Sequence, residues 1–162
     1  MSQVLDLYRK VTRLPQGDRL FSLLFSQKAP YFATIRPRFT VLEPNHSELV
    51  IRKRRGVHNH IKTVHVIAIC NGLEAAMGAL AEATVPGDKR WIPKGMEVSY
   101  TAKATSDITC IAETDPEQWT GDEPDVPVRV RGVRKDGTVV IEGTIRLWVT
   151  EKPARQPAQS AT

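Results

Sequence analysis

A histidine-rich polar loop runs directly into an apolar segment that carries one carboxylate. The loop covers residues 58–65, and the apolar segment continues to Gly78 with Glu74 as its one charged residue. An ionised carboxylate is costly to bury, so it needs a partner, a wet cleft or a chemical role. Two interpretations follow: Glu74 lies on a strip open to solvent, or it is the acid/base or nucleophilic carboxylate of an active site.

The element that would position Glu74 can be predicted from hydrophobic spacing. Apolar residues recur at helical intervals from Val66 to Leu80, and further apolar residues occupy the other faces of the same segment. A helix that is apolar all round is typically buried inside its domain. We therefore expect a long central helix that is wrapped by the rest of the chain and closes near Pro86.

Helices and strands flank this central segment. An amphipathic helical pattern covers residues 3–13, and a second helix around residues 20–25 ends before Pro30. Strand-like runs follow at residues 32–42 and 48–54, and after the central helix at 96–105, 108–112, 126–130 and 139–149. Lys135-Asp136-Gly137 is a strong hairpin turn. The order predicts an α+β domain in which a curved antiparallel sheet covers one helix.

Length and composition indicate one globular domain. The chain has 162 residues, of which 41% are hydrophobic and 25% charged. We divide it into an N-terminal helical extension (1–29), a main domain (30–151) and a tail (152–162) whose Pro, Ala, Gln and Ser content predicts disorder. No apolar run approaches the roughly 20 residues of a membrane span, and the N-terminus has no secretory pattern. We expect a cytoplasmic protein.

Cysteine and charge limit the possible partners. Cys70 and Cys110 are separated and show no metal-ligand spacing, which favours a packing role and predicts no metal site. The net charge is +5, with short basic runs at 52–55 and 89–90 and alternating arginines after residue 128. Such runs form a solvated face, meet the phosphates of a carrier such as coenzyme A, or bind nucleic acid. We find no aromatic RNA-binding pattern or helix-turn-helix, so we expect no nucleic-acid partner.

The predicted layout resembles the hotdog fold, in which a curved antiparallel sheet wraps a central helix. The phenylacetyl-CoA-type thioesterases of that superfamily carry a loop Asn, a His-Gly-Gly six residues later and an Asp or Glu nine residues beyond the His. Asn59, His65 and Glu74 stand at these spacings. The sequence around them is also similar to an uncharacterised thioesterase-like branch of the superfamily. The resemblance covers residues of about 30 to 150.

The resemblance implies an acyl-thioester hydrolase, with acyl-CoA as substrate and no metal or cofactor. Glu74 would activate water or attack the thioester carbonyl, and backbone amides around His65 and Val66 would bind the oxyanion. Asn59 would orient the water or carbonyl, or else caps its loop. Substrate-binding candidates are His60, Asn71 as a neighbour of Glu74, and the possible phosphate ligands Lys89, Arg90, Arg129 and Arg131.

One departure concerns the helix start. Val66-Ile67 stands where the family has Gly-Gly. The backbone N–H groups are retained, but Val66 and Ile67 have side chains at positions where the family has glycine. The departure favours a second interpretation, in which the protein binds acyl-CoA or another acyl ligand without turnover.

Helix geometry predicts a dimer. Nine residues separate His65 from Glu74 by about 13 Å and roughly half a turn. One helix therefore cannot easily direct both groups at the same carbonyl, whereas two helices related by a two-fold axis can. We expect a homodimer, or a dimer of dimers, with two composite sites.

A third interpretation comes from the same superfamily. Its hydroxyacyl-thioester dehydratases pair a His with a Glu fourteen residues later, and His60 and Glu74 have that spacing. The Pro and Gly residues that shape the dehydratase loop are missing between them. Substitution of His60 would separate the two enzymatic interpretations.

Overall fold

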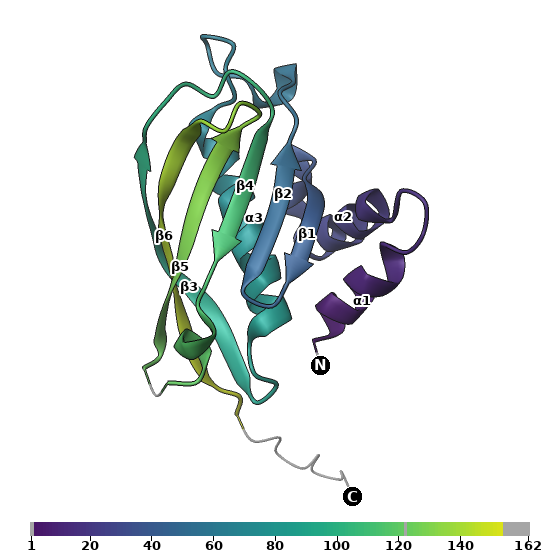
Figure 1. The fold of residues 1–162 in the computed structure, drawn as a ribbon, viewed down its shortest axis with the longest axis vertical. Helices are drawn as coiled ribbons and strands as arrows, with labels where there is room; N and C mark the ends of the chain where they lie inside the picture. Colours follow the sequence, from purple (N-terminus) through teal and green to yellow (C-terminus); the bar gives the residue numbers. More distant parts are fainter. Residues whose placement is uncertain (1, 122, 154–162) are drawn as a thin grey trace, which may run out of the picture.

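The computed structural model describes residues 2–121 and 123–153, so most of the predicted tail lies outside the described residues. Figure 1 shows the arrangement of the elements. They are α1 (Gln3–Val11), α2 (Gly17–Lys28), the 3₁₀ helix η1 (Pro30–Ile35), β1 (Arg38–Glu43), β2 (His46–Ile51), η2 (Arg55–Val57), α3 (Val66–Thr84), β3 (Lys89–Tyr100), β4 (Ile108–Glu113), η3 (Pro116–Trp119), β5 (Asp125–Arg134) and β6 (Val139–Glu151).

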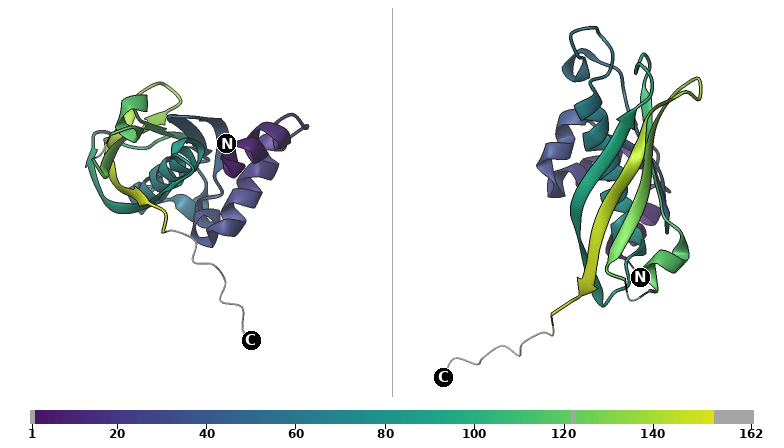
Figure 2. Two further views of the ribbon diagram at one scale, coloured as in Figure 1. Left: turned by 90° about the horizontal axis from the view of Figure 1, so that it is seen from below. Right: turned by 90° about the vertical axis from the view of Figure 1, so that its left-hand side faces the viewer.

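The six strands form one antiparallel sheet in the order β1-β2-β4-β5-β6-β3. The sheet curves around α3, which lies in its concave side (Figures 1 and 2). On β5, Val126, Val128 and Val130 are buried toward the helix, while Arg129 and Arg131 lie on the outer face. The prediction of a curved antiparallel sheet around one long helix is confirmed.

Helix α3 is covered by the sheet on most sides but not on all of them. It begins after His65 and ends at Thr84, before Pro86. The prediction that every face is buried is wrong, because Ile67, Glu74 and Glu82 are exposed. Helical spacing places these three on one stripe, together with Asn71 and Gly78. We call these five residues the α3 stripe; it contains both solvent-exposed positions and positions covered by neighbouring elements.

The N-terminal helices pack against β1 and one side of α3. Their contact is aromatic: the Phe21 ring lies edge-on to Phe39 with 5.4 Å between centroids, and Phe25 stacks on Phe32 at 5.9 Å. The predicted strand at residues 32–42 begins only at Arg38. Phe32 turns back onto Phe25 within η1, and Arg36 adopts a left-handed conformation (φ 49°) just before Pro37, which interrupts extended structure.

Strand β3 begins earlier than the pattern suggested, at Lys89 rather than Met96. A bulge between Pro93 and Gly95 shifts its register against β6. An extra residue at a bulge breaks the simple alternation on which the prediction depended. The strand is an edge of the sheet, with β6 on one side and no strand on the other among the described residues.

Helix α3 is also long and apolar enough to meet the length and hydropathy criteria for a membrane-crossing helix. In this structure 61% of that stretch is buried inside the protein, as in the core helix of a globular domain.

Candidate active site

The start of α3 presents a free backbone amide. His65 is the helix N-cap: its N–H donates to the Val57 carbonyl (2.7 Å), and its Nδ1 accepts the Ile67 N–H (3.1 Å). The Val66 N–H, the first of the helix, has no hydrogen-bond partner in the part of the chain that the structure describes. A free amide at the positive end of a helix dipole is suited to bind developing negative charge.

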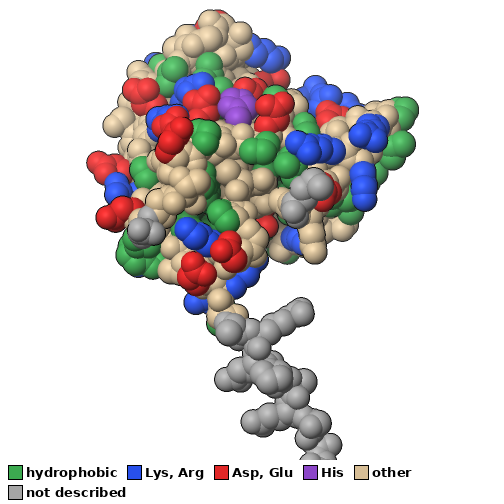
Figure 3. Space-filling view, turned by 60° about the horizontal axis from the view of Figure 1, so that its bottom comes forward, with side chains coloured by type: hydrophobic (Ala, Val, Ile, Leu, Met, Phe, Trp, Pro, Cys, Tyr) green, Lys and Arg blue, Asp and Glu red, His purple; other side chains and the backbone are tan. Residues whose placement is uncertain are grey.

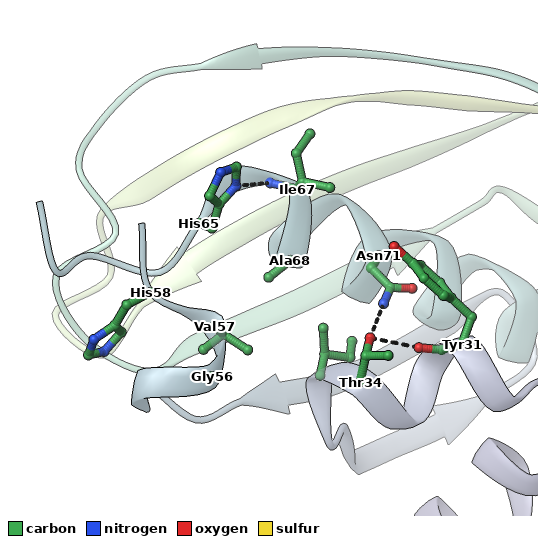
Figure 4. Close-up of a pocket in the computed structure, with 10 residues that line it drawn as sticks. Tyr31, Thr34, Gly56, Val57, His58, His65, Ile67, Ala68 and Asn71 are labelled. Atoms are coloured by element: carbon green, nitrogen blue, oxygen red, sulfur yellow. Dashed lines mark hydrogen bonds between the residues drawn. The ribbon is translucent and has the colours of Figure 1, made fainter. Parts of the chain in front are cut away.

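A hollow of about 370 Å³ lies beside this helix start, and we call it the N-terminal pocket (Figure 4). It is formed by η1, the loop after β2 and the first turns of α3. Residues that line it include Tyr31, Thr34, Gly56, His58, His65 and Asn71. His58 Nε2 and Asn71 Oδ1 are buried without a partner among the described residues. Such atoms are costly to leave unpaired, so the pocket offers hydrogen bonds to water or a ligand.

No sequence pattern marks Tyr31 or Thr34 as a site residue: Thr34 falls within the predicted strand at residues 32–42, and Tyr31 lies just before it. In the structure Asn71 Nδ2 donates to Thr34 Oγ1 (3.2 Å), and Arg54 Nη2 donates to the Thr34 carbonyl (2.7 Å). Arg54 thus leaves the solvated face expected of the basic run and ties η1 to the loop after β2. A Cβ at Gly56 would meet the Arg54 guanidinium, so a larger residue there would displace the Arg54 side chain.

The loop residues Asn59 and His60 are placed differently from each other. Asn59 Oδ1 accepts the N–H groups of Ile61 (3.2 Å) and Thr63 (3.1 Å), and its Nδ2 donates to Thr63 Oγ1 (2.8 Å). These bonds make Asn59 the residue that shapes its loop. His60 is exposed and has no side-chain hydrogen bond among the described residues. Neither residue lines the N-terminal pocket.

Glu74 lines a second hollow, farther along the α3 stripe. This hollow measures about 400 Å³, and Glu74 shares it with Lys28, Phe32, Gly78 and Trp91. We call it the Glu74 groove. His65 does not line it, so within one chain the Glu74 carboxylate and the start of α3 lie at separate hollows. Asn71 shares the α3 stripe with Glu74, as predicted, but it lines the N-terminal pocket, and its side chain bonds to Thr34.

The predicted phosphate ligands lie outside both hollows. Lys89 and Arg90 begin β3, at the end of the sheet where α3 ends (Figure 1), and Arg90 Nε donates to Thr150 Oγ1 (3.3 Å). Arg129 and Arg131 share one sheet face, as predicted, but it is the outer face, away from α3.

Ion pairs occupy those outer arginines. Arg129 bonds both oxygens of Asp115 (2.7 and 3.0 Å), and Arg131 bonds Glu113. The Arg131 guanidinium holds the pKa of the Glu113 carboxyl below its ordinary value. Acidic and basic side chains are likewise interleaved over the face drawn in Figure 3. Paired charges of this kind do not form a continuous cationic surface.

The environment of the two thiols disfavours the thiolate form. Burial raises the pKa of Cys70, and it raises that of the fully buried Cys110 far above the ordinary range. Both side chains are therefore protonated at neutral pH, whereas thiolates are the reactive form. Within residues 2–121 and 123–153, no cluster of three or more His, Cys, Asp or Glu side chains is arranged to hold a metal ion.

Comparison with known proteins identifies the family. Residues 17–149 match the model of a domain family described as a domain of unknown function, DUF4442. No curated protein matches the chain. The crystal structure of the structural-genomics protein APC5556 shows 36% identity and a TM-score of 0.80, covering 92% of this chain and 99% of its own.

More distant structures share the fold. The Pseudomonas aeruginosa protein PA5026 is 22% identical over 86% of this chain and 97% of its own, with a TM-score of 0.72. A thioesterase family protein from Silicibacter pomeroyi is 17% identical over 85% of this chain and 100% of its own, with a TM-score of 0.66. These similarities confirm that the chain shares its fold with a thioesterase family protein, as predicted. The chain has the hotdog fold and belongs to the DUF4442 family.

Proposed function

We propose that the protein is an acyl-thioester hydrolase with acyl-CoA as substrate. Glu74 is its catalytic carboxylate, and the Val66 amide of a second copy binds the oxyanion. The observation that carries this proposal is the free Val66 N–H at the start of the same helix on which Glu74 is exposed. The thioesterase family protein from Silicibacter pomeroyi, which has the same fold, supports this class of reaction.

The chemistry requires only water and the residues of the chain. Glu74 takes a proton from water, and the hydroxide adds to the thioester carbonyl, whose oxygen becomes negative. The Val66 N–H donates to that oxygen. The carbonyl then re-forms, the carbon–sulfur bond breaks, and the thiolate leaves with the proton that Glu74 returns. The products are a carboxylic acid and a free thiol.

A two-fold dimer would bring these groups together. The free edge of β3 carries inward-facing apolar residues that are not covered, among them Tyr100 (62% exposed), and Ile67 on α3 is 55% exposed. An exposed apolar surface beside an unpaired strand edge is typical of an interface. In our proposal the β3 edges of two copies pair, and the α3 start of each copy faces Glu74 of the other.

The opposite sheet edge differs in a way that supports this choice. At β1, the Tyr8 hydroxyl of α1 donates to the Thr40 carbonyl (3.1 Å), and the N-terminal helices pack along the strand. On β3, Pro93 has no N–H to donate, so pairing is expected over the stretch from Met96 to Tyr100. We propose a cytoplasmic location for the resulting dimer, in keeping with its two free cysteines.

One observation favours a second function, acyl-ligand binding without turnover. The Ile67 N–H, which could be a second oxyanion donor, is already bonded to His65 Nδ1 (3.1 Å). Removal of one oxyanion donor typically costs a factor of about 10² to 10³ in turnover. A cleft with one free amide retains the ability to bind a thioester.

The test measures thiol release from butyryl-, octanoyl-, palmitoyl- and phenylacetyl-CoA. We expect turnover by the parent protein and a loss of about 10²-fold or more in kcat for Glu74→Gln, because a positioned general base contributes that much. His60→Ala is expected to retain hydrolysis, whereas a dehydratase would lose its activity. Absence of thiol release from every thioester, with binding retained in Glu74→Gln, would instead establish the binding function.

A further inference from the structure

The Glu74 groove has the form of a pocket for an apolar chain. It lies between α2 and η1 on one side and α3 and the start of β3 on the other. Its volume of about 400 Å³ falls within the range of small-molecule sites, roughly 300–1,000 Å³. The Phe25 and Phe32 rings, stacked at 5.9 Å, belong to one wall, and the fully buried Met77 lies at its base.

The floor of the groove is open because of a glycine. Gly78 follows Glu74 by one helical turn on the α3 stripe. A Cβ on Gly78 would meet only one side chain within 4 Å, the Trp91 ring at 3.6 Å. This distance is an ordinary van der Waals contact, so the helix does not require glycine here for packing. The missing side chain leaves space that a bound ligand can occupy.

The two ends of the groove are chemically different. Of the α3 residues that line the groove, Glu74 is the first along the helix and Glu82 is the last. Toward the other end, Trp91 reaches from β3, and its Nε1 donates to Glu82 Oε1 (3.1 Å), which joins the strand to the helix. Eight residues separate Glu74 from Glu82, a rise of about 12 Å along α3. Along α3, the groove therefore runs from the Glu74 carboxylate to an indole that is hydrogen-bonded to a second carboxylate, Glu82.

Charge on the rim is compatible with an anionic carrier. The exposed Lys28 lies at the end of α2 and lines the groove, and its ammonium has no ion-pair partner among the described residues. Of the two carboxylates on the rim, Glu82 is bonded to Trp91 and Glu74 is the proposed catalytic group. An apolar interior beside a free cation suits a molecule with an apolar tail and an anionic head.

We propose that this groove binds the acyl chain of a medium-chain acyl-CoA and that Trp91 sets the upper limit of chain length. The proposal rests on the proposed function, since it assigns the substrate class of the same site. The acyl chain extends from the thioester at Glu74 over Gly78 to the Trp91 indole. The carrier stays outside, near Lys28. Trp91 and Gly78 are specificity-determining residues and take no part in bond cleavage.

The test compares kcat/KM for butyryl-, octanoyl- and palmitoyl-CoA in two groove variants. We expect the parent to prefer octanoyl-CoA. Trp91→Ala opens the end of the groove, so the palmitoyl-to-octanoyl ratio should rise by about tenfold or more, because added methylenes then gain burial. Gly78→Leu fills the floor, so activity on octanoyl-CoA should fall by about tenfold or more relative to butyryl-CoA.

The matched control is Trp148→Ala. Trp148 lies on the outer sheet face beneath Lys94, and its removal should leave the chain-length order unchanged. Circular dichroism of each variant identifies any variant that fails to fold. If one groove variant fails, the chain-length preference of the other tests the groove assignment. Hydrolysis whose chain-length order is the same in the parent, Trp91→Ala and Gly78→Leu would overturn the groove assignment while leaving the hydrolase intact.

A different result would separate the groove from the proposed function. If the parent releases no thiol, calorimetric titration with octanoyl-CoA tests the groove alone. Binding that Gly78→Leu weakens by about tenfold or more would support an acyl groove in a protein without turnover. Equal affinity in the parent and Gly78→Leu, or no binding by the parent, would overturn the assignment.

Discussion

At the scale of single residues, the Asp107 carboxylate joins two segments that lie far from each other in the sequence. Asp107 stands in the break between the predicted strands at residues 96–105 and 108–112. In the structure its Oδ1 accepts the Lys53 N–H (2.8 Å), and its Oδ2 pairs with Lys135 Nζ (3.0 Å). The Lys53 amide, with Lys135 beside it, holds the pKa of this carboxyl below its ordinary value of 3.8.

A lowered carboxyl pKa predicts a defined pH dependence. The stabilisation by Asp107 is present above pH 3.8 and is lost as pH falls through the lowered pKa, because only the carboxylate makes these bonds strongly. Asp107→Ala should reduce the free energy of unfolding by about 1.5 kcal/mol at pH 7, and the difference should vanish in acid. Urea unfolding between pH 7 and pH 2 measures it. The control is Asp88→Ala, at an exposed carboxyl that has no side-chain hydrogen bond among the described residues. A loss of unfolding free energy in Asp107→Ala that does not change with pH would refute the electrostatic cause.

At the scale of elements, the two longest strands depend on a close backbone approach. Strand β3 pairs with β6 along almost its whole length, and Gly143 lies opposite Val98. A Cβ at Gly143 would overlap the Glu97 carbonyl and lie 2.7 Å from the Val98 Cα. Both are backbone atoms, so no side-chain rotation relieves the contact. The glycine is thus needed to keep β3, and with it Trp91, against the rest of the sheet.

Gly143→Ala is therefore expected to be strongly destabilising. Overpacking against backbone should cost about 3 kcal/mol in the free energy of unfolding. Gly95→Ala in the same strand pair is the matched control, because a Cβ there meets nothing within 4 Å. Denaturant titration compares the two variants. Equal midpoints for Gly143→Ala and the parent would show that the strands can separate at little cost, contrary to this interpretation.

At the scale of the whole molecule, the proposed activity depends on a second copy of the chain. Tyr100→Glu places a charge on the exposed apolar surface beside the β3 edge, where it would be desolvated on pairing. We expect the parent to be a dimer and the variant a monomer by light scattering after size exclusion, with thioester hydrolysis lost in the monomer. Leu23→Glu is the control, at an α2 position that is 58% exposed and away from β3. A monomeric parent with full turnover would exclude the composite site.

The sequence by itself determined the elements whose signals are local. The extent of α3 follows from apolar spacing between His65 and Pro86, and the β5–β6 hairpin follows from Lys135-Asp136-Gly137, where Gly137 has φ 85°. The alternation of buried and exposed residues on β4 and β5 was likewise readable. These features succeed because backbone hydrogen bonding and side-chain periodicity act over a few residues.

The tertiary structure alone decided which surfaces meet. The turn of η1 toward Phe25, the contact of Arg54 with Thr34, and the closure of the groove by Trp91 and Glu82 all join distant parts of the chain. The exposed positions of the α3 stripe, Ile67, Glu74 and Glu82, arise in the same way, because the sheet curves around the helix but does not close. Such contacts depend on which apolar surfaces the whole chain can bury at the same time. Local periodicity in the sequence does not encode the choice among these surfaces.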